Sequence, residues 1–205
     1  MTGASDEPAG VHLRRLTGAD LEGALDDVAR LRIEVFRAFP YLYDGDAAYE
    51  RDYLQTYRDS ADAILIGAFD GTRLIGAATG TPMADHADDF AAALADQPQA
   101  PDLSQIFYCA ESVLLPDYRG RGLGHAFFDA REEHARALGF GYSAFCSVVR
   151  PADHPCRPAG YRPLDTFWRG RGYAPLPGAV AHFDWRDVGA AEQSRHDLQL
   201  WMRRL

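Results

Sequence analysis

Lysine is absent from the 205-residue sequence, and all 21 basic residues are arginine. A P-loop nucleotidase needs the lysine of its phosphate-binding loop, so this class of protein is excluded. Chemistry through a lysine Schiff base is excluded for the same reason. The 30 acidic residues outnumber the arginines and give a formal net charge of −9 at pH 7. We therefore expect no nucleic-acid partner, because binding a phosphate backbone needs clustered cations.

Cysteine is scarce, with Cys109, Cys146 and Cys156 as its only occurrences. An odd number at this spacing fits no disulfide framework, which favours a reducing compartment. Two of the cysteines, with His154 between them in the sequence, suggest a metal site or a Cys–His nucleophile, but no fourth ligand follows at a zinc-like spacing. A cysteine in the middle of a strand is more often a small buried hydrophobe. We therefore predict no metal site.

Long apolar runs are missing too, and no segment approaches the length of a membrane span. Residues 1–10 are small, polar and acidic, and they lack the apolar core of a secretory signal. We predict a disordered lead over residues 1–10, a single domain over residues 11–205, no membrane partner and a cytoplasmic location. The hydrophobic content of 47% and the charged content of 25% are ordinary for a soluble globular domain.

Hydrophobic periodicity predicts the secondary structure. In chain order we expect a strand at 11–16, helices at 21–39 and around 49–57, strands at 63–69, 73–81 and 106–115, a helix at 123–138, a strand at 142–149, a short helix at 164–171, and a final hairpin of 180–188 and 197–205. Residues 84–104 look like an insertion with a short helix at 88–94. Strands interleaved with helices imply an α/β domain with a mixed sheet.

The most informative segment is a glycine-rich turn at residues 119–124, between a predicted strand and a predicted helix. The first N–H groups of a helix have no intrahelical acceptor, and the helix dipole adds partial positive charge at that end. Glycines let a phosphate group approach the main chain closely. The turn therefore predicts a pyrophosphate site made of backbone groups.

Spacing excludes a dinucleotide-binding turn, because neither Gly120 nor Gly122 begins a Gly-x-Gly-x-x-Gly motif. The pattern Arg119-x-x-Gly122-x-Gly124, preceded by the segment 115–118, instead resembles the acetyl-CoA loop of the GNAT superfamily of N-acetyltransferases. The later segment 167–173, Phe-Trp-Arg-Gly-Arg-Gly-Tyr, is similar to the family's Phe-Tyr-x-x-x-Gly-Phe helix. The resemblance extends over residues 11–205.

This resemblance implies a GNAT-like fold and an acetyl-CoA site. Backbone groups of Val113, Leu114 and Leu115 would hold the pantetheine arm as an added strand. The pyrophosphate would lie against the turn formed by Arg119, Gly120, Arg121, Gly122, Leu123, Gly124 and His125. The strands at 106–115 and 142–149 would splay apart, so that the thioester enters between them.

Acetyl transfer to an amine needs a base for the amine and a donor for the developing oxyanion, which a strand N–H near Val113 or Leu114 could supply. Glu111 lies on the strand that leads to the cofactor site, and we predict it to be the general base, with Asp153 and His154 as rivals. Trp168 stands where the family often has the tyrosine that protonates the thiolate. We therefore predict Tyr161 as the substitute acid.

The sequence does not identify the acceptor amine, and it leaves open whether the chain forms a homodimer. A region rich in tyrosine and carboxylates at 41–53 could attract a cationic amine, although tyrosines spaced by four also suit a helix buried in a core. Arg150, Arg157 and Arg162 could bind an acidic group, or they could be solvated. The alternative to an enzyme is a GNAT-like module that binds acyl-CoA as a sensor without catalysis.

Overall fold

The computed structural model of the chain describes residues 10–95, 97 and 100–205, so most of the predicted disordered lead lies outside the described residues. The strands are β1 (Val11–Leu16), β2 (Ile64–Asp70), β3 (Arg73–Pro82), β4 (Ile106–Tyr108), β5 (Ser112–Leu114), β6 (Tyr142–Val148), β7 (Ala174–Trp185) and β8 (Ser194–Arg204). The helices are α1 (Gly18–Phe36), α2 (Ala47–Asp59), α3 (Ala87–Ala95), α4 (Leu123–Ala137) and α5 (Asp165–Gly170), with short 3-10 turns at Met83–His86, Leu103–Gln105 and Pro116–Tyr118.

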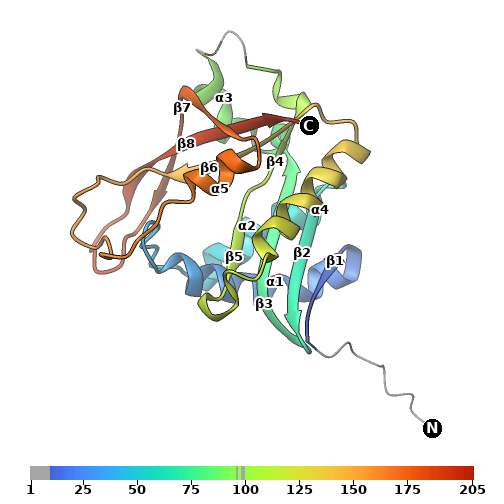
Figure 1. Cartoon of the computed structure of the whole chain (residues 1–205), viewed down its shortest axis with the longest axis horizontal. Helices are drawn as coiled ribbons and strands as arrows, with labels where there is room; N and C mark the ends of the chain where they lie inside the picture. The colour runs from blue at the N-terminus through green and yellow to red at the C-terminus, as the bar shows by residue number, and fades with distance from the viewer. Residues whose placement is uncertain (1–9, 96, 98–99) are drawn as a thin grey trace.

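The strands form one sheet in the order β1-β2-β3-β4-β6-β8-β7, with β5 paired to β3 off this path (Figure 1). Only the β4–β6 pair is parallel among the described strands, and the other pairs are antiparallel. Helices α1 and α2 lie behind the sheet in Figure 1, and α4 crosses in front of it. The predicted mixed α/β architecture is therefore confirmed.

The predicted strand at 106–115 is divided into two pieces by residues 109–111. The first piece, β4, pairs with both β3 and β6, whereas β5 pairs with β3 alone. The side chain of Arg131, from α4, is 1% exposed and donates to the carbonyl oxygens of Thr79 at 3.1 Å and Glu111 at 2.9 Å. The Arg131 guanidinium therefore supplies the hydrogen-bond donors that these two carbonyl oxygens need at the break. Beyond the break β5 stays with β3 and β6 stays with β8, so the sheet splays there as expected.

Several predicted boundaries differ from the structure by three residues or more. Helix α1 begins at Gly18 instead of residue 21, and strand β8 begins at Ser194 instead of residue 197. Helix α1 ends at Phe36 instead of residue 39, because the Tyr43 N–H donates to the Phe36 carbonyl and the chain turns back there. Strand β7 begins at Ala174 instead of residue 180, with a register shift between Pro175 and Val180. The end of α1 and the start of β7 depend on backbone hydrogen bonds that hydrophobic periodicity does not report.

The predicted insertion contains α3, which packs on β7 through a second hydrophobic cluster that includes Phe90 and Ala181. Among the described residues, no helix is both long and apolar enough to span a lipid bilayer.

Candidate active site

The glycine turn has the backbone conformation expected of an anion site. Gly120 and Gly122 have φ angles of 74° and 83°, in the left-handed region that favours glycine. Gly122 precedes the first residue of α4 and supplies no side-chain cap, so the N–H groups of the first helical turn remain open donors. A Cβ built on either glycine meets no atom within 4 Å. The space in front of these donors is therefore free for a ligand.

A large cavity of about 820 Å³ extends from this turn between the splayed strands, and we call it the long cavity. Its lining includes Leu114, Arg119, Gly120, Gly122, Gly124 and His125 from the predicted cofactor set. Arg121 and Leu123 do not line it, since Arg121 donates to the Asp117 carbonyl at 2.8 Å and Leu123 packs on the core.

The backbone of β5 determines which groups face the long cavity. The Leu115 N–H donates to the Ile75 carbonyl at 3.0 Å, and the Glu111 carbonyl accepts from the Thr79 N–H at 3.1 Å. Alternate residues of an extended strand direct their backbone groups to opposite edges, so the backbone groups of Val113 face β3 and those of Leu114 face the cavity. Of the three predicted pantetheine-binding residues, the geometry leaves Leu114 with an outward-facing amide.

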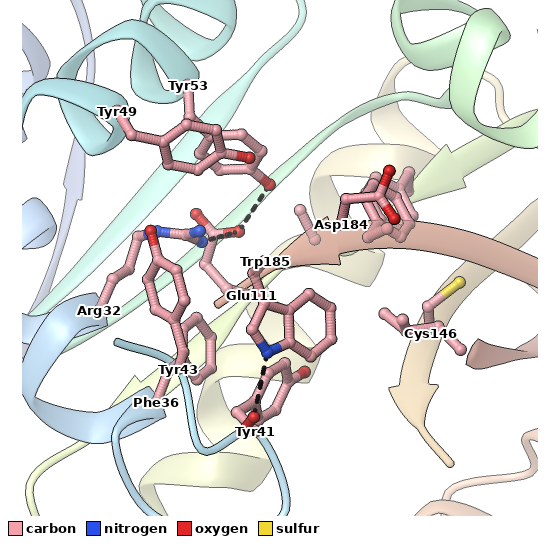
Figure 2. A pocket seen from close by; sticks show the side chains of 14 residues that line it. Arg32, Phe36, Tyr41, Tyr43, Tyr49, Tyr53, Glu111, Cys146, Asp184 and Trp185 are labelled. Atoms are coloured by element: carbon pink, nitrogen blue, oxygen red, sulfur yellow. Dashed lines mark hydrogen bonds and ion pairs between the residues drawn. The ribbon is translucent and has the colours of Figure 1, made fainter. Parts of the chain in front are cut away.

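A second, smaller cavity of about 100 Å³ adjoins the long cavity, and we call it the aromatic pocket (Figure 2). Its walls include Phe36, Tyr41, Tyr43, Tyr49, Tyr53 and Trp185. Phe36, Tyr41, Ala110 and Cys146 line both cavities. The two cavities therefore share a wall at these four residues, beside the break in the sheet.

Glu111 lies in the wall of the aromatic pocket with its side chain only 2% exposed. Its Oε2 atom pairs with Arg32 Nη1 at 2.8 Å and accepts from the hydroxyls of Tyr53 at 3.2 Å and Tyr57 at 3.4 Å. Its Oε1 atom is buried and has no partner within the described residues. A buried carboxylate oxygen without a donor is unfavourable, so this atom is suited to accept from a bound molecule.

Arg32 is a site residue that the sequence analysis did not identify. It binds two buried carboxylates, Glu111 and Glu50, and these two neighbours and Tyr53 hold its pKa well above the ordinary value despite its burial. One feature of the sequence could have identified Arg32: it lies on the apolar face of α1, four residues after Val28 and four before Phe36. A charged residue on a buried helix face needs a partner, and here the partner is the predicted base.

Tyr41 stands at the junction of the two cavities. Its backbone carbonyl accepts from Arg150 Nη2 at 2.7 Å and from Trp185 Nε1 at 3.2 Å, and Arg150 also forms a two-pronged pair with Asp187. Burial raises the pKa of the Tyr41 hydroxyl above its ordinary value, so the group keeps its proton. Arg150 therefore holds the loop that carries Tyr41.

Tyr161, the predicted acid, lines the long cavity but not the aromatic pocket. Its ring packs edge-on against Phe39 at 4.7 Å, and burial raises its pKa. Trp168 also lines the long cavity, where its ring lies 4.9 Å from that of Phe145. Tyr41 and Tyr161 therefore both line the long cavity, as Trp168 does, and each could bring a hydroxyl group to it.

The rival bases lie elsewhere. Asp153 is exposed, and His154 accepts a hydrogen bond from the Cys156 N–H at 3.2 Å. Neither residue lines the long cavity or the aromatic pocket. Over residues 10–95, 97 and 100–205, no group of three or more His, Cys, Asp or Glu side chains could hold a metal ion.

A glycine turn at a helix N-terminus, a splayed sheet and a buried carboxylate together define an acyltransferase-like site. The acetyltransferase (GNAT) family model matches residues 28–158, more than half of the sequence, and the chain belongs to this family. This confirms the family resemblance, and the match includes the glycine-turn motif at 119–124. A search of curated proteins found no match.

Solved structures of this class share the fold over nearly the whole chain. Arabidopsis thaliana NAA60 in complex with acetyl-CoA has a TM-score of 0.60 at 14% identity, covering 95% of this chain and 98% of that one. Salmonella typhimurium yncA with its cofactor acetyl-CoA has a TM-score of 0.59 at 11% identity, covering 96% and 94%. Brucella melitensis ribosomal-protein-alanine N-acetyltransferase has a TM-score of 0.59 at 13% identity, covering 95% and 99%. Such identities support the fold alone.

Proposed function

We propose that the protein transfers the acetyl group of acetyl-CoA to a primary amine. One observation carries the proposal: the long cavity, which begins at the glycine turn, shares wall residues with the aromatic pocket, which holds the buried carboxylate of Glu111. The phosphate-binding end and the proton-accepting end of the proposed site are thus in neighbouring cavities. Family membership and two structural relatives solved with acetyl-CoA support the same donor.

The described residues fit acetyl-CoA at three points. The open N–H groups at the start of α4 would bind the pyrophosphate, and the exposed Arg119 would add positive charge nearby. The carbonyl oxygen of Leu114, which accepts from Arg119 Nε at 3.2 Å, would accept a second hydrogen bond from an amide N–H of the pantetheine arm. When bound, acetyl-CoA supplies an activated acetyl thioester.

Glu111 is the proposed general base. Its unpartnered Oε1 atom would accept the proton that the amine nitrogen loses as the new C–N bond forms. The outward-facing N–H of Leu114 is the proposed donor to the developing oxyanion. The departing thiolate then needs a proton, which Tyr161 or Tyr41 would donate from the wall of the long cavity.

Two tyrosine-to-phenylalanine variants show whether Tyr161 or Tyr41 is the proton donor. We propose Tyr161 as the donor, and Tyr161→Phe should then lower kcat about 10- to 100-fold with little change in the KM for acetyl-CoA, because the hydroxyl acts mainly in the transition state. Tyr41→Phe is the matched comparison, since Tyr41 borders both cavities. If Tyr161→Phe keeps full kcat while Tyr41→Phe loses it, the proton comes from Tyr41.

The test of the proposed function is release of free thiol from acetyl-CoA in the presence of a panel of primary amines. Acetyl-CoA alone should also raise the Tm, because a ligand that binds only the folded state stabilises it. A raised Tm without amine-dependent thiol release would instead support a sensor that binds acyl-CoA. No change in Tm and no calorimetric heat at saturating acetyl-CoA would contradict both.

A further inference from the structure

The aromatic pocket carries a net negative charge within the part of the chain that the structure describes. Its charged lining residues are Arg32, Glu111 and Asp184. The guanidinium of Arg32 is already shared between Glu111 and Glu50, both of which are buried. Its positive charge is therefore more than neutralised. A carboxylate brought into the pocket would meet repulsion without an available cation to compensate for its lost hydration.

Aromatic rings form most of the wall and favour a cation with an apolar body. The Arg32 guanidinium lies 4.3 Å from the centre of the Tyr53 ring and 5.2 Å from that of Phe36, so Arg32 occupies one face of each and the remaining rings of the wall are left for a ligand. At the rim, Tyr49 is 49% exposed and stacks on Tyr53 with ring centres 6.4 Å apart. Figure 2 shows Tyr49 and Tyr53 side by side above Arg32 and Glu111. A flat ring entering past Tyr49 would extend this stack.

Deeper in the pocket the polar groups suit one amine. Glu111 Oε1 is the buried acceptor that lacks a partner among the described residues. The pocket volume of about 100 Å³ leaves space for a small group. Asp184 is 58% exposed and pairs with the exposed Arg195 at 3.7 Å, so the selectivity of the pocket rests on its buried charges. Glu111 and Glu50 together outweigh the single positive charge of Arg32, so the pocket favours a cation over an anion.

We propose that the acceptor is a small arylalkylamine: a primary amine on an aromatic body, without a carboxylate beside the amine. This substrate class rests on the proposed function for its chemistry and on the aromatic pocket for its selectivity. The ring would stack at Tyr49, and the amine would reach Glu111 in the wall of the aromatic pocket. Amino acids with the same ring would be rejected, since their carboxylate has no free partner in the pocket.

The experiment uses phenethylamine and phenylalanine, which share a ring and an amine and differ by one carboxylate. Each is titrated by calorimetry into the full-length protein saturated with free coenzyme A, so that binding is measured without turnover. We expect phenethylamine to bind at least about tenfold more tightly, and we expect Tyr49→Ala to remove most of that binding while Tyr49→Phe retains it. Tyr49 is exposed, so its variants should fold normally.

Equal or tighter binding of phenylalanine would overturn the proposal, as would unchanged phenethylamine binding by Tyr49→Ala. The thiol-release assay is run with the same two compounds and reports separately on the proposed function. Selective binding without thiol release would refute acetyl transfer to this amine class and leave the pocket's selectivity standing. Thiol release with other amines but no selective binding would refute the arylalkylamine proposal alone.

Discussion

Replacing Gly122 by alanine tests whether the glycine turn binds the coenzyme. Its φ of 83° costs a non-glycine residue about 1–2 kcal/mol, which corresponds to a fall in Tm of about 2–8 °C for a chain of this size. The added Cβ would meet no protein atom within 4 Å, so it would project into the space where a phosphate approaches the backbone. Loss of one charge-assisted hydrogen bond there should weaken acetyl-CoA binding about 10- to 150-fold.

Gly139, at the other end of α4, provides the matched control. Its φ is 87°, a Cβ built on it also meets nothing within 4 Å, and it does not line the long cavity. Gly139→Ala should lower the Tm to a similar extent and leave acetyl-CoA affinity unchanged. Both affinities are measured by calorimetry well below the Tm of either variant. Equal affinities for the two variants would refute a pyrophosphate site at this turn.

Substitutions at Gly124, Glu111 and His134 give three further tests. Gly124→Ala should raise the Tm, because alanine favours a helix by up to about 1 kcal/mol and its Cβ would lie at an ordinary contact distance of 3.6 Å from Phe167. The same variant should bind acetyl-CoA more weakly, because Gly124 lines the long cavity. A Tm scan and a calorimetric titration of one sample check the two effects, and an unchanged affinity for acetyl-CoA would contradict the expected loss of binding. Glu111→Gln should lower kcat by about 10²- to 10⁴-fold while circular dichroism and acetyl-CoA affinity stay near those of the parent, and a variant with full kcat would remove Glu111 from the mechanism. Burial, with a smaller contribution from Arg15, lowers the pKa of His134 below its ordinary value of 6.5, so the unfolded chain takes up the proton first and the free energy of unfolding falls as the pH drops below 6.5. His134→Gln should make the Tm less dependent on pH over that range, and an identical pH profile would show that other groups dominate it.

The glycine turn could be predicted from the sequence because its requirements are local. Positive φ angles and open helix N–H groups need only a few neighbouring residues, and the motif between Arg119 and Gly124 supplies them. The strand and helix order was likewise visible in the periodicity of apolar residues. Fold and family therefore followed from short segments.

The break in the sheet and the partners of Glu111 could not be predicted in the same way. The break depends on Arg131 reaching from α4 to the carbonyls of Thr79 and Glu111, which are remote from it in sequence. The pairing of Glu111 with Arg32 depends on how α1 packs against β5. Periodicity predicts which face of an element is buried, but it does not predict which polar groups meet there.

The proposed function requires that the acetyl group passes directly from acetyl-CoA in the long cavity to an amine in the aromatic pocket. Initial rates measured over a grid of acetyl-CoA and amine concentrations test it most directly. Both substrates must be bound together for direct transfer, so we expect double-reciprocal lines that intersect. Parallel lines would contradict direct transfer and would indicate an acetylated enzyme intermediate, with Cys109 or Cys146 in the cavity wall as the residues to examine.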